Sequence, residues 1–115
     1  MTAEEHTALG AAYEAQGKAD LARAEYEAAL AARESAGPLL GLGNLAVAEG
    51  RSGEAEAYFR RALRHEPDNA LIQNNLAWAL LLEGKALEEA ETLAREALAR
   101  EPRLAPYIRD TLALL

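Results

Sequence analysis

Apolar residues recur along the chain at a spacing of three or four positions, which is the spacing of one face of an α-helix. Segments of about a dozen residues with this spacing follow one another. Turns that contain Gly17, Gly50 or Gly84 join them into pairs. The β-branched residues that strands favour are nearly absent, since the only Val and Ile residues are Val47, Ile72 and Ile108. The pattern predicts an all-α chain built from pairs of amphipathic helices.

The same pattern repeats with a period of about 33 residues. Small residues return at Gly10, Gly43 and Ala77 and again at Ala22, Ala55 and Ala90, while the bulky Tyr26 and Phe59 align with Ala94. Facing small residues let two helices approach closely, so the aromatic rings are expected to fill the gap between one pair and the next. A lone pair cannot bury this surface, and the pairs must therefore stack.

These boundaries predict one domain over residues 1–115. Its expected parts are repeat 1 at 3–35, repeat 2 at 36–69, repeat 3 at 70–104, and a closing helix or partial fourth repeat at 105–115. Thr2 and Glu5 have the capping-box spacing, and Pro67-Asp68-Asn69 offers an N-cap to the helix that follows. The third repeat carries one extra residue, which falls within Lys85 to Glu89.

The order Leu-Gly, aromatic, Gly, Ala, aromatic, Ala, Pro resembles the tetratricopeptide repeat over nearly the whole chain. Departures occur where Glu34 replaces the terminal proline and where Ala46, Leu80 and Ala94 replace aromatic residues. The resemblance implies a right-handed α–α superhelix, or solenoid, of three helix pairs plus one C-terminal helix, seven helices in all. It also implies a non-enzymatic scaffold or adaptor that binds a protein or peptide in its concave groove.

In the family frame the first helix of each pair lines that groove. The inward positions are Thr7, Ala11 and Glu14 in repeat 1, and Leu81 together with the predicted partner-binding residues Leu40, Asn44, Val47, Asn74, Asn75 and Trp78 in repeats 2 and 3. Asn44 and Asn75 stand where some members of the family use amides to grip a peptide, because an amide both donates and accepts hydrogen bonds. Trp78 is expected either in the core or in the groove, and the sequence favours neither, although tryptophan often dominates binding energy.

The basic residues that accompany those asparagines in a carboxylate clamp are missing. Leu40 occupies one such position, and the position in the fourth repeat falls on Asp110 or Thr111. Without a cation the charge-assisted hydrogen bonds to a carboxylate are lost. We therefore expect no preference for a free C-terminal carboxylate.

The end of the chain offers an alternative function. Leu112, Leu114 and Leu115 give the last helix little polarity, whereas closing helices of such stacks prefer a polar outer face. Either the array continues beyond this helix or another copy of the chain covers it. The alternative is a self-assembly module that forms a homodimer through this helix.

Charge disfavours nucleic acid and anionic membranes as partners. The net charge is −7, and no basic domain emerges along the chain. The one basic group, made of Arg60, Arg61, Arg64 and His65, is interpreted as a solvated helix face balanced by Glu54, Glu56 and Glu66.

Signals of catalysis or cofactor binding are weak. The chain has no cysteine, and His6 and His65 lie in different repeats without a ligand partner at helical spacing, so we expect no metal, no cofactor and no enzyme activity. The acidic start lacks the features of a signal peptide, and the longest apolar run, Leu76 to Leu82, is too short to span a membrane. A cytoplasmic protein is expected.

Overall fold

The computed structural model describes residues 1–115 and contains no strand. Seven α-helices follow one another, with a short 3₁₀ turn, η1 (Pro102–Leu104), before the last: α1 (Ala3–Ala15), α2 (Ala19–Ala32), α3 (Ala36–Ala48), α4 (Ser52–His65), α5 (Ala70–Glu83), α6 (Leu87–Arg100) and α7 (Ala105–Ala113). The prediction of an all-α stack of three helix pairs and one further helix is confirmed.

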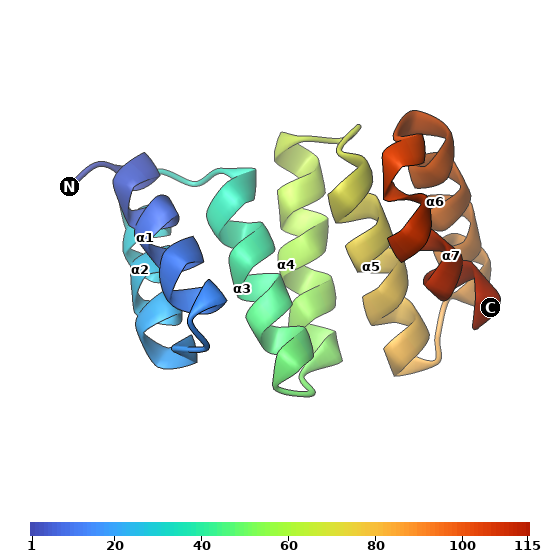
Figure 1. Cartoon of the computed structure of the whole chain (residues 1–115), viewed down its shortest axis with the longest axis horizontal. Helices are drawn as coiled ribbons and strands as arrows, with labels where there is room; N and C mark the ends of the chain where they lie inside the picture. Colours follow the sequence, from blue (N-terminus) through green and yellow to red (C-terminus); the bar gives the residue numbers. More distant parts are fainter.

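The helix pairs line up along the long axis of the molecule (Figure 1). The closest packing lies within the pairs α1–α2, α3–α4 and α5–α6, and α2 packs on α3, α4 on α5 and α6 on α7. The chain measures 40 × 26 × 22 Å, with the N-terminus at one end of the stack and α7 at the other. This is the solenoid arrangement, in which each unit packs on its neighbours in sequence.

Both predicted N-caps are present. At α1 the Thr2 hydroxyl accepts a hydrogen bond from the Glu5 backbone N–H at 3.0 Å, and the Glu5 carboxylate accepts one from the Thr2 N–H at 2.8 Å. At α5 the side-chain oxygen of Asn69 accepts from the Ile72 N–H at 3.1 Å. Because each cap satisfies backbone donors that the first helical turn leaves free, the sequence fixes where these two helices begin.

Left-handed residues reverse the chain within each pair. Gly17, Gly50 and Gly84 have φ angles of 75°, 76° and 69°, a region that costs glycine little because it has no Cβ. Two residues, Lys85 and Ala86, separate the glycine from the next helix in the third pair, where the other pairs have one, and Ala86 takes a second left-handed conformation with φ 50°. The extra residue of the third pair therefore lies in this loop.

Two aromatic rings sit against helix backbones that carry glycine. A Cβ built at Gly41 in α3 would lie 2.3 Å from the ring of Tyr26, and a Cβ at Gly10 in α1 would lie 2.8 Å from it. The Phe59 ring packs in the same way on Gly43, where a Cβ would be 2.3 Å away. Tyr26 thus joins the first pair to the second, and no larger residue fits at these glycines while the rings stay in place.

The buried apolar residues form two clusters of unequal size. The larger contains 16 buried residues from α3 to α7, with Phe59 fully buried among alanines and leucines. The smaller contains four, namely Ala22, Tyr26, Leu42 and Leu45, and it holds the first pair to the second. Apolar burial is therefore concentrated toward the C-terminal two thirds of the stack.

Ion pairs across the joints correct one interpretation of the basic group on α4. Arg61 and His65 contact Glu34 at 2.6 and 2.9 Å, so their partner is the residue that replaces the family proline. Arg60 contacts Glu56, as expected, and also grips Glu89 on α6 at 2.8 and 2.9 Å. Glu54 and Glu66 are not partners of this group, because the neighbouring pairs bring closer carboxylates to it.

A partly buried pair of carboxylates, Glu56 and Glu83, lies where α4, α5 and α6 meet. Arg60 lowers the pKa of Glu56 to about 2 through a hydrogen bond at 2.8 Å, while burial raises the pKa of Glu83 above its ordinary value, helped by the nearby Glu56. Lys85 reaches Glu56 at 3.0 Å and Glu83 at 3.8 Å. Arg60 and Lys85 compensate the charge of Glu56, whereas one oxygen of Glu83 is buried without a hydrogen-bond partner. We assign the cluster to the joint between the pairs.

Candidate functional site

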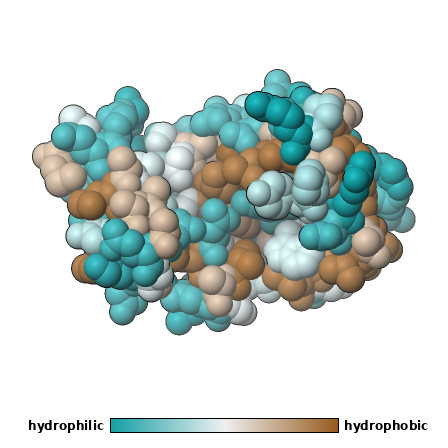
Figure 2. Space-filling model, viewed as in Figure 1, coloured by the Kyte–Doolittle hydropathy of each residue, from teal (hydrophilic) through white to brown (hydrophobic).

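The first helix of each pair faces the same side of the stack. The helices α1, α3, α5 and α7 contact one another in succession, and Figure 1 shows them nearer the viewer than α2 and α6. In the same view hydrophobic side chains gather over the central part of this face, with hydrophilic ones around them (Figure 2). Because exposed apolar patches on small domains often mark interaction surfaces, this face is the first place to look for a site.

Asn44 and Asn75 meet across the joint between α3 and α5. The Asn75 amide nitrogen donates a hydrogen bond to the Asn44 side-chain oxygen at 3.0 Å, and both side chains are partly buried. The two amides that the sequence places in the groove therefore lie side by side. They use part of their hydrogen-bonding capacity on each other, which leaves a donor on Asn44 and an acceptor on Asn75.

A cavity of about 250 Å³ opens next to this pair, between α5 and α7. Its lining residues are Leu71, Asn74, Asn75, Trp78, Tyr107, Asp110 and Thr111. Trp78 is half-buried and lines this cavity, so the tryptophan lies on the groove side of α5. An apolar cleft with a few convergent polar groups is the usual form of a binding site.

The sequence did not single out two of these lining residues as contributors. Leu71, in the first turn of α5, is 40% exposed, and Tyr107 on α7 is 67% exposed. The sequence carried no signal for either residue, because their exposure follows from how α7 packs on α5 and α6. Of the two residues considered for the fourth position, Asp110 is exposed and Thr111 is buried, and both line the cavity.

Leu40 and Val47 lie elsewhere. Both are partly buried and pack against the large apolar cluster, and neither lines a cavity. The structure thus brings Asn74, Asn75 and Trp78 together at one cavity with Asn44 at its border. It leaves Leu40 and Val47 on α3, outside that cavity.

A second groove lies between α1 and α3, with a volume of about 310 Å³. Thr7 and Ala11, two of the predicted inward residues, are among those that line it. Most of its polar groups are already paired: the Thr7 hydroxyl donates to the Ala3 carbonyl at 2.8 Å, and Glu4 pairs with Arg33, which leaves the Ser35 hydroxyl. Glu14 is likewise occupied, since it accepts a 2.6 Å hydrogen bond from the Tyr26 hydroxyl, whose pKa burial raises.

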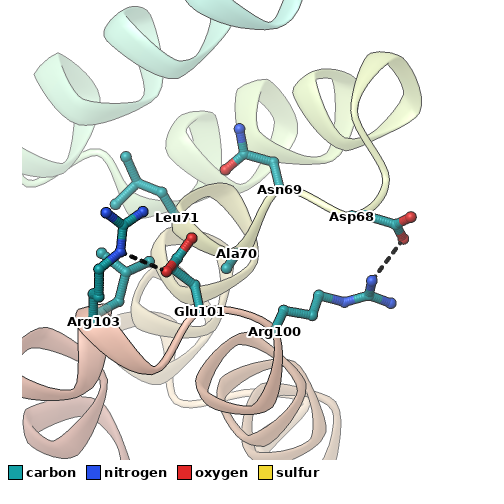
Figure 3. A pocket seen from close by; sticks show the side chains of 8 residues that line it. Asp68, Asn69, Ala70, Leu71, Arg100, Glu101 and Arg103 are labelled. Carbon is teal, nitrogen blue, oxygen red and sulfur yellow. Dashed lines mark hydrogen bonds and ion pairs between the residues drawn. The ribbon is translucent and has the colours of Figure 1, made fainter.

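The largest cavity, of about 370 Å³, lies at the edge where the α4–α5 loop approaches η1 (Figure 3). Arg100 pairs with Asp68 at 3.0 Å, and Arg103 pairs with Glu101 at 2.8 Å. The arginine also lowers the pKa of the Glu101 carboxyl. The charged groups of this cavity are thus paired within the chain, and the Asn69 side chain caps α5. Few polar groups remain free to bind a ligand there.

The leucines at the chain end differ in exposure. Leu112 is partly buried and packs against the large cluster, whereas Leu114 and Leu115 are 62% and 38% exposed. The apolar surface predicted here is therefore made by the last two residues and does not include the whole of Leu112.

Each histidine contacts a carboxylate outside its own helix, Glu25 on α2 for His6 and Glu34 in the α2–α3 loop for His65. His6 contacts Glu25 at 2.7 Å as an isolated pair, whereas His65 contacts Glu34 at 2.9 Å and shares that carboxylate with Arg61. No group of three His, Asp or Glu side chains is arranged to hold a metal ion. None of the seven helices combines the length and the apolar character needed to cross a membrane.

Comparison with known families gives two matches of the same description. One family model described as tetratricopeptide repeat matches residues 40–107, and another with that description matches residues 6–35. Together they cover the three helix pairs and the beginning of α7. No curated protein matches the chain significantly.

Proposed function

The chain belongs to the tetratricopeptide repeat family, and from that premise we propose that it binds a peptide segment of another protein in the groove between α5 and α7. Repeats of this family are generally protein-interaction modules, and the family is typically a non-enzymatic scaffold. The proposed role is that of an adaptor in the cytoplasm, where a chain without cysteine loses nothing in a reducing environment.

The observation that carries the proposal is the half-buried Trp78 in the cavity beside the Asn44–Asn75 pair. Tryptophan in a partly desolvated pocket is a common source of binding energy, because its large ring buries much apolar area at little entropic cost. The amides at the border add a donor and an acceptor for a peptide backbone. Apolar and polar contacts thus converge on one place, as peptide recognition requires.

Charge supports a protein partner over nucleic acid. The net charge is −7, and two arginines of the basic group on α4 are held in ion pairs: Arg60 with Glu56 on the same helix and with Glu89 on α6, and Arg61 with Glu34. A phosphate backbone needs free clustered cations, and these arginines are not free.

Changing Trp78 to Ala is expected to weaken binding of peptides selected on the wild-type chain from a random display library. We expect the Kd to rise about 30-fold, which corresponds to about 2 kcal/mol for a dominant contact. Isothermal titration calorimetry measures both affinities without relying on the tryptophan signal.

The matched control is Leu87→Ala on α6, which removes a side chain of 46% exposure that lies outside the cavity. Its Kd should stay at the wild-type value. Selected peptides that bind the Trp78→Ala chain as tightly as the wild type would place their site elsewhere and overturn the proposal.

The exposure of Leu114 and Leu115 favours a second candidate, self-assembly through α7. Sedimentation equilibrium over a dilution series would then show a dimer that dissociates on dilution, and Leu114→Ser with Leu115→Ser would give a monomer at all concentrations. We leave Leu112 unchanged, because it packs against the core and its loss would disturb folding. A wild-type mass that stays monomeric across the series would exclude this candidate.

A further inference from the structure

The α5–α7 cavity combines two aromatic side chains with a carboxylate. Trp78 from α5 and Tyr107 from α7 both line it, and Tyr107 is 67% exposed. The faces of aromatic rings carry partial negative charge and attract cations, tryptophan most strongly. Rings from two different helices around one cavity are suited to hold a cationic group between them.

Asp110 is the single charged residue among those that line this cavity. It is exposed and makes no ion pair, unlike the acidic residues of the neighbouring cavity, where Arg100 holds Asp68 and Arg103 holds Glu101. Neither lysine nor arginine contributes to the lining. The charge inside the cavity is thus negative and uncompensated, in a chain whose net charge is −7.

Asn74 adds an acceptor that has no donor. The residue is only 6% exposed, it lines the cavity, and its side-chain oxygen is buried without a hydrogen-bond partner. A buried acceptor left unpaired is unfavourable, so a donor in the cavity would relieve that cost once the Asn74 amide turns toward it. The Asn74 oxygen favours a group that donates hydrogen bonds, and the Asp110 carboxylate favours one that carries positive charge.

We infer that this cavity binds the positively charged side chain of an arginine or lysine in the bound peptide, with Asp110 as its counter-ion and Trp78 and Tyr107 along its stem. The inference rests on the proposed groove function and names the chemistry of the partner. The bound group would be positively charged, whereas a carboxylate clamp binds a negative group with cations that this groove lacks.

The test uses the full chain and two probes, N-acetyl-arginine amide and its uncharged isostere N-acetyl-citrulline amide. Because the chain has one tryptophan, the indole N–H of Trp78 gives a single signal in a ¹H–¹⁵N NMR spectrum. Titration with millimolar arginine amide should shift this signal in a saturable way, and citrulline amide should not. Asp110→Asn should weaken arginine binding about fivefold, the effect of one partly exposed charge pair.

The control is Glu27→Gln on α2, which removes an exposed carboxylate that makes no ion pair and lies far from the cavity in the stack. It lowers the net negative charge as much as Asp110→Asn does, so a general charge effect would weaken both variants equally. Equal effects of the two variants, or equal binding of citrulline and arginine, would overturn the inference.

The two proposals can fail separately. If display peptides bind through Trp78 but carry no enriched arginine or lysine, and arginine amide leaves the indole signal unmoved, the groove function stands and the cationic inference falls. If the display peptides bind the Trp78→Ala chain as tightly as the wild type, in contrast, the groove function itself falls.

Discussion

Phe59→Ala is expected to lower the free energy of unfolding of the chain by about 3–5 kcal/mol, the range for removing a fully buried aromatic ring. Phe59 has no exposed surface and lies in the large apolar cluster that spans α3 to α7. Its ring packs on Gly43, so little backbone can move in to fill the space. Urea unfolding followed by far-UV circular dichroism measures the loss.

A double-mutant cycle with Gly43→Ala tests the reason for that loss. In the wild-type chain the new methyl group would lie 2.3 Å from the Phe59 ring, and we expect a further destabilisation of about 1–3 kcal/mol from overpacking. In the Phe59→Ala background the ring is gone, and the same change should be neutral or stabilising by up to about 1 kcal/mol, because alanine favours helix over glycine. Equal effects in both backgrounds would show that the ring and the glycine do not pack as described.

Tyr26→Ala should release the first helix pair from the stack and leave the remainder folded. The Tyr26 ring contacts the backbone of both α1 and α3, and it belongs to the small cluster of four buried residues. Its loss is expected to remove about 3 kcal/mol or more from that joint, and in a linear stack the effect stays near the site. Native-state amide hydrogen exchange should show protection in α1 and α2 reduced on the order of 100-fold, with α5 and α6 little changed.

The control for this prediction is Tyr26→Phe, which keeps the ring and removes the 2.6 Å hydrogen bond to Glu14. It should cost about 1 kcal/mol, the usual net worth of one hydrogen bond. If Tyr26→Ala reduces protection equally in α1, α2, α5 and α6, the chain unfolds as one cooperative unit and the independence of the first pair is disproved.

Much of the fold could be predicted from the sequence, because its determinants are local. The Thr2 and Asn69 caps, the glycines that take positive φ, and the small residues at helix contacts act over a few residues of chain. The extra residue of the third loop could also be located, since the offset between aligned residues changes there. Local rules of this kind hold whatever the packing around them.

Contacts across the joints could not be predicted, because they depend on how one pair rotates against the next. The family frame placed Asn44 and Asn75 in one groove but did not show the hydrogen bond between their side chains. The partner of Arg61 and His65 was likewise misassigned, since Glu34 comes from the preceding pair. Spacing along one helix says little about a neighbour about 30 positions away.

The candidate site was foreseen in part for the same reason. Trp78 and Asn75 were placed from the family frame, and the structure puts both at one cavity. Tyr107 was missed because, in this last helix, the family frame was used only for the clamp position at Asp110 or Thr111. Its exposure became evident only once α7 was packed on α5 and α6.

The hydrogen bond between Asn75 and Asn44 also has polarity. Because Asn75 donates and Asn44 accepts, the amide on α3 keeps its N–H groups and the amide on α5 keeps its oxygen. An incoming main chain that crosses this joint finds a donor on one helix and an acceptor on the other. Under the proposed groove function, a peptide that lies across this joint would give a carbonyl to the amide on α3 and an N–H to the oxygen on α5, so the two asparagines would act together as one main-chain contact.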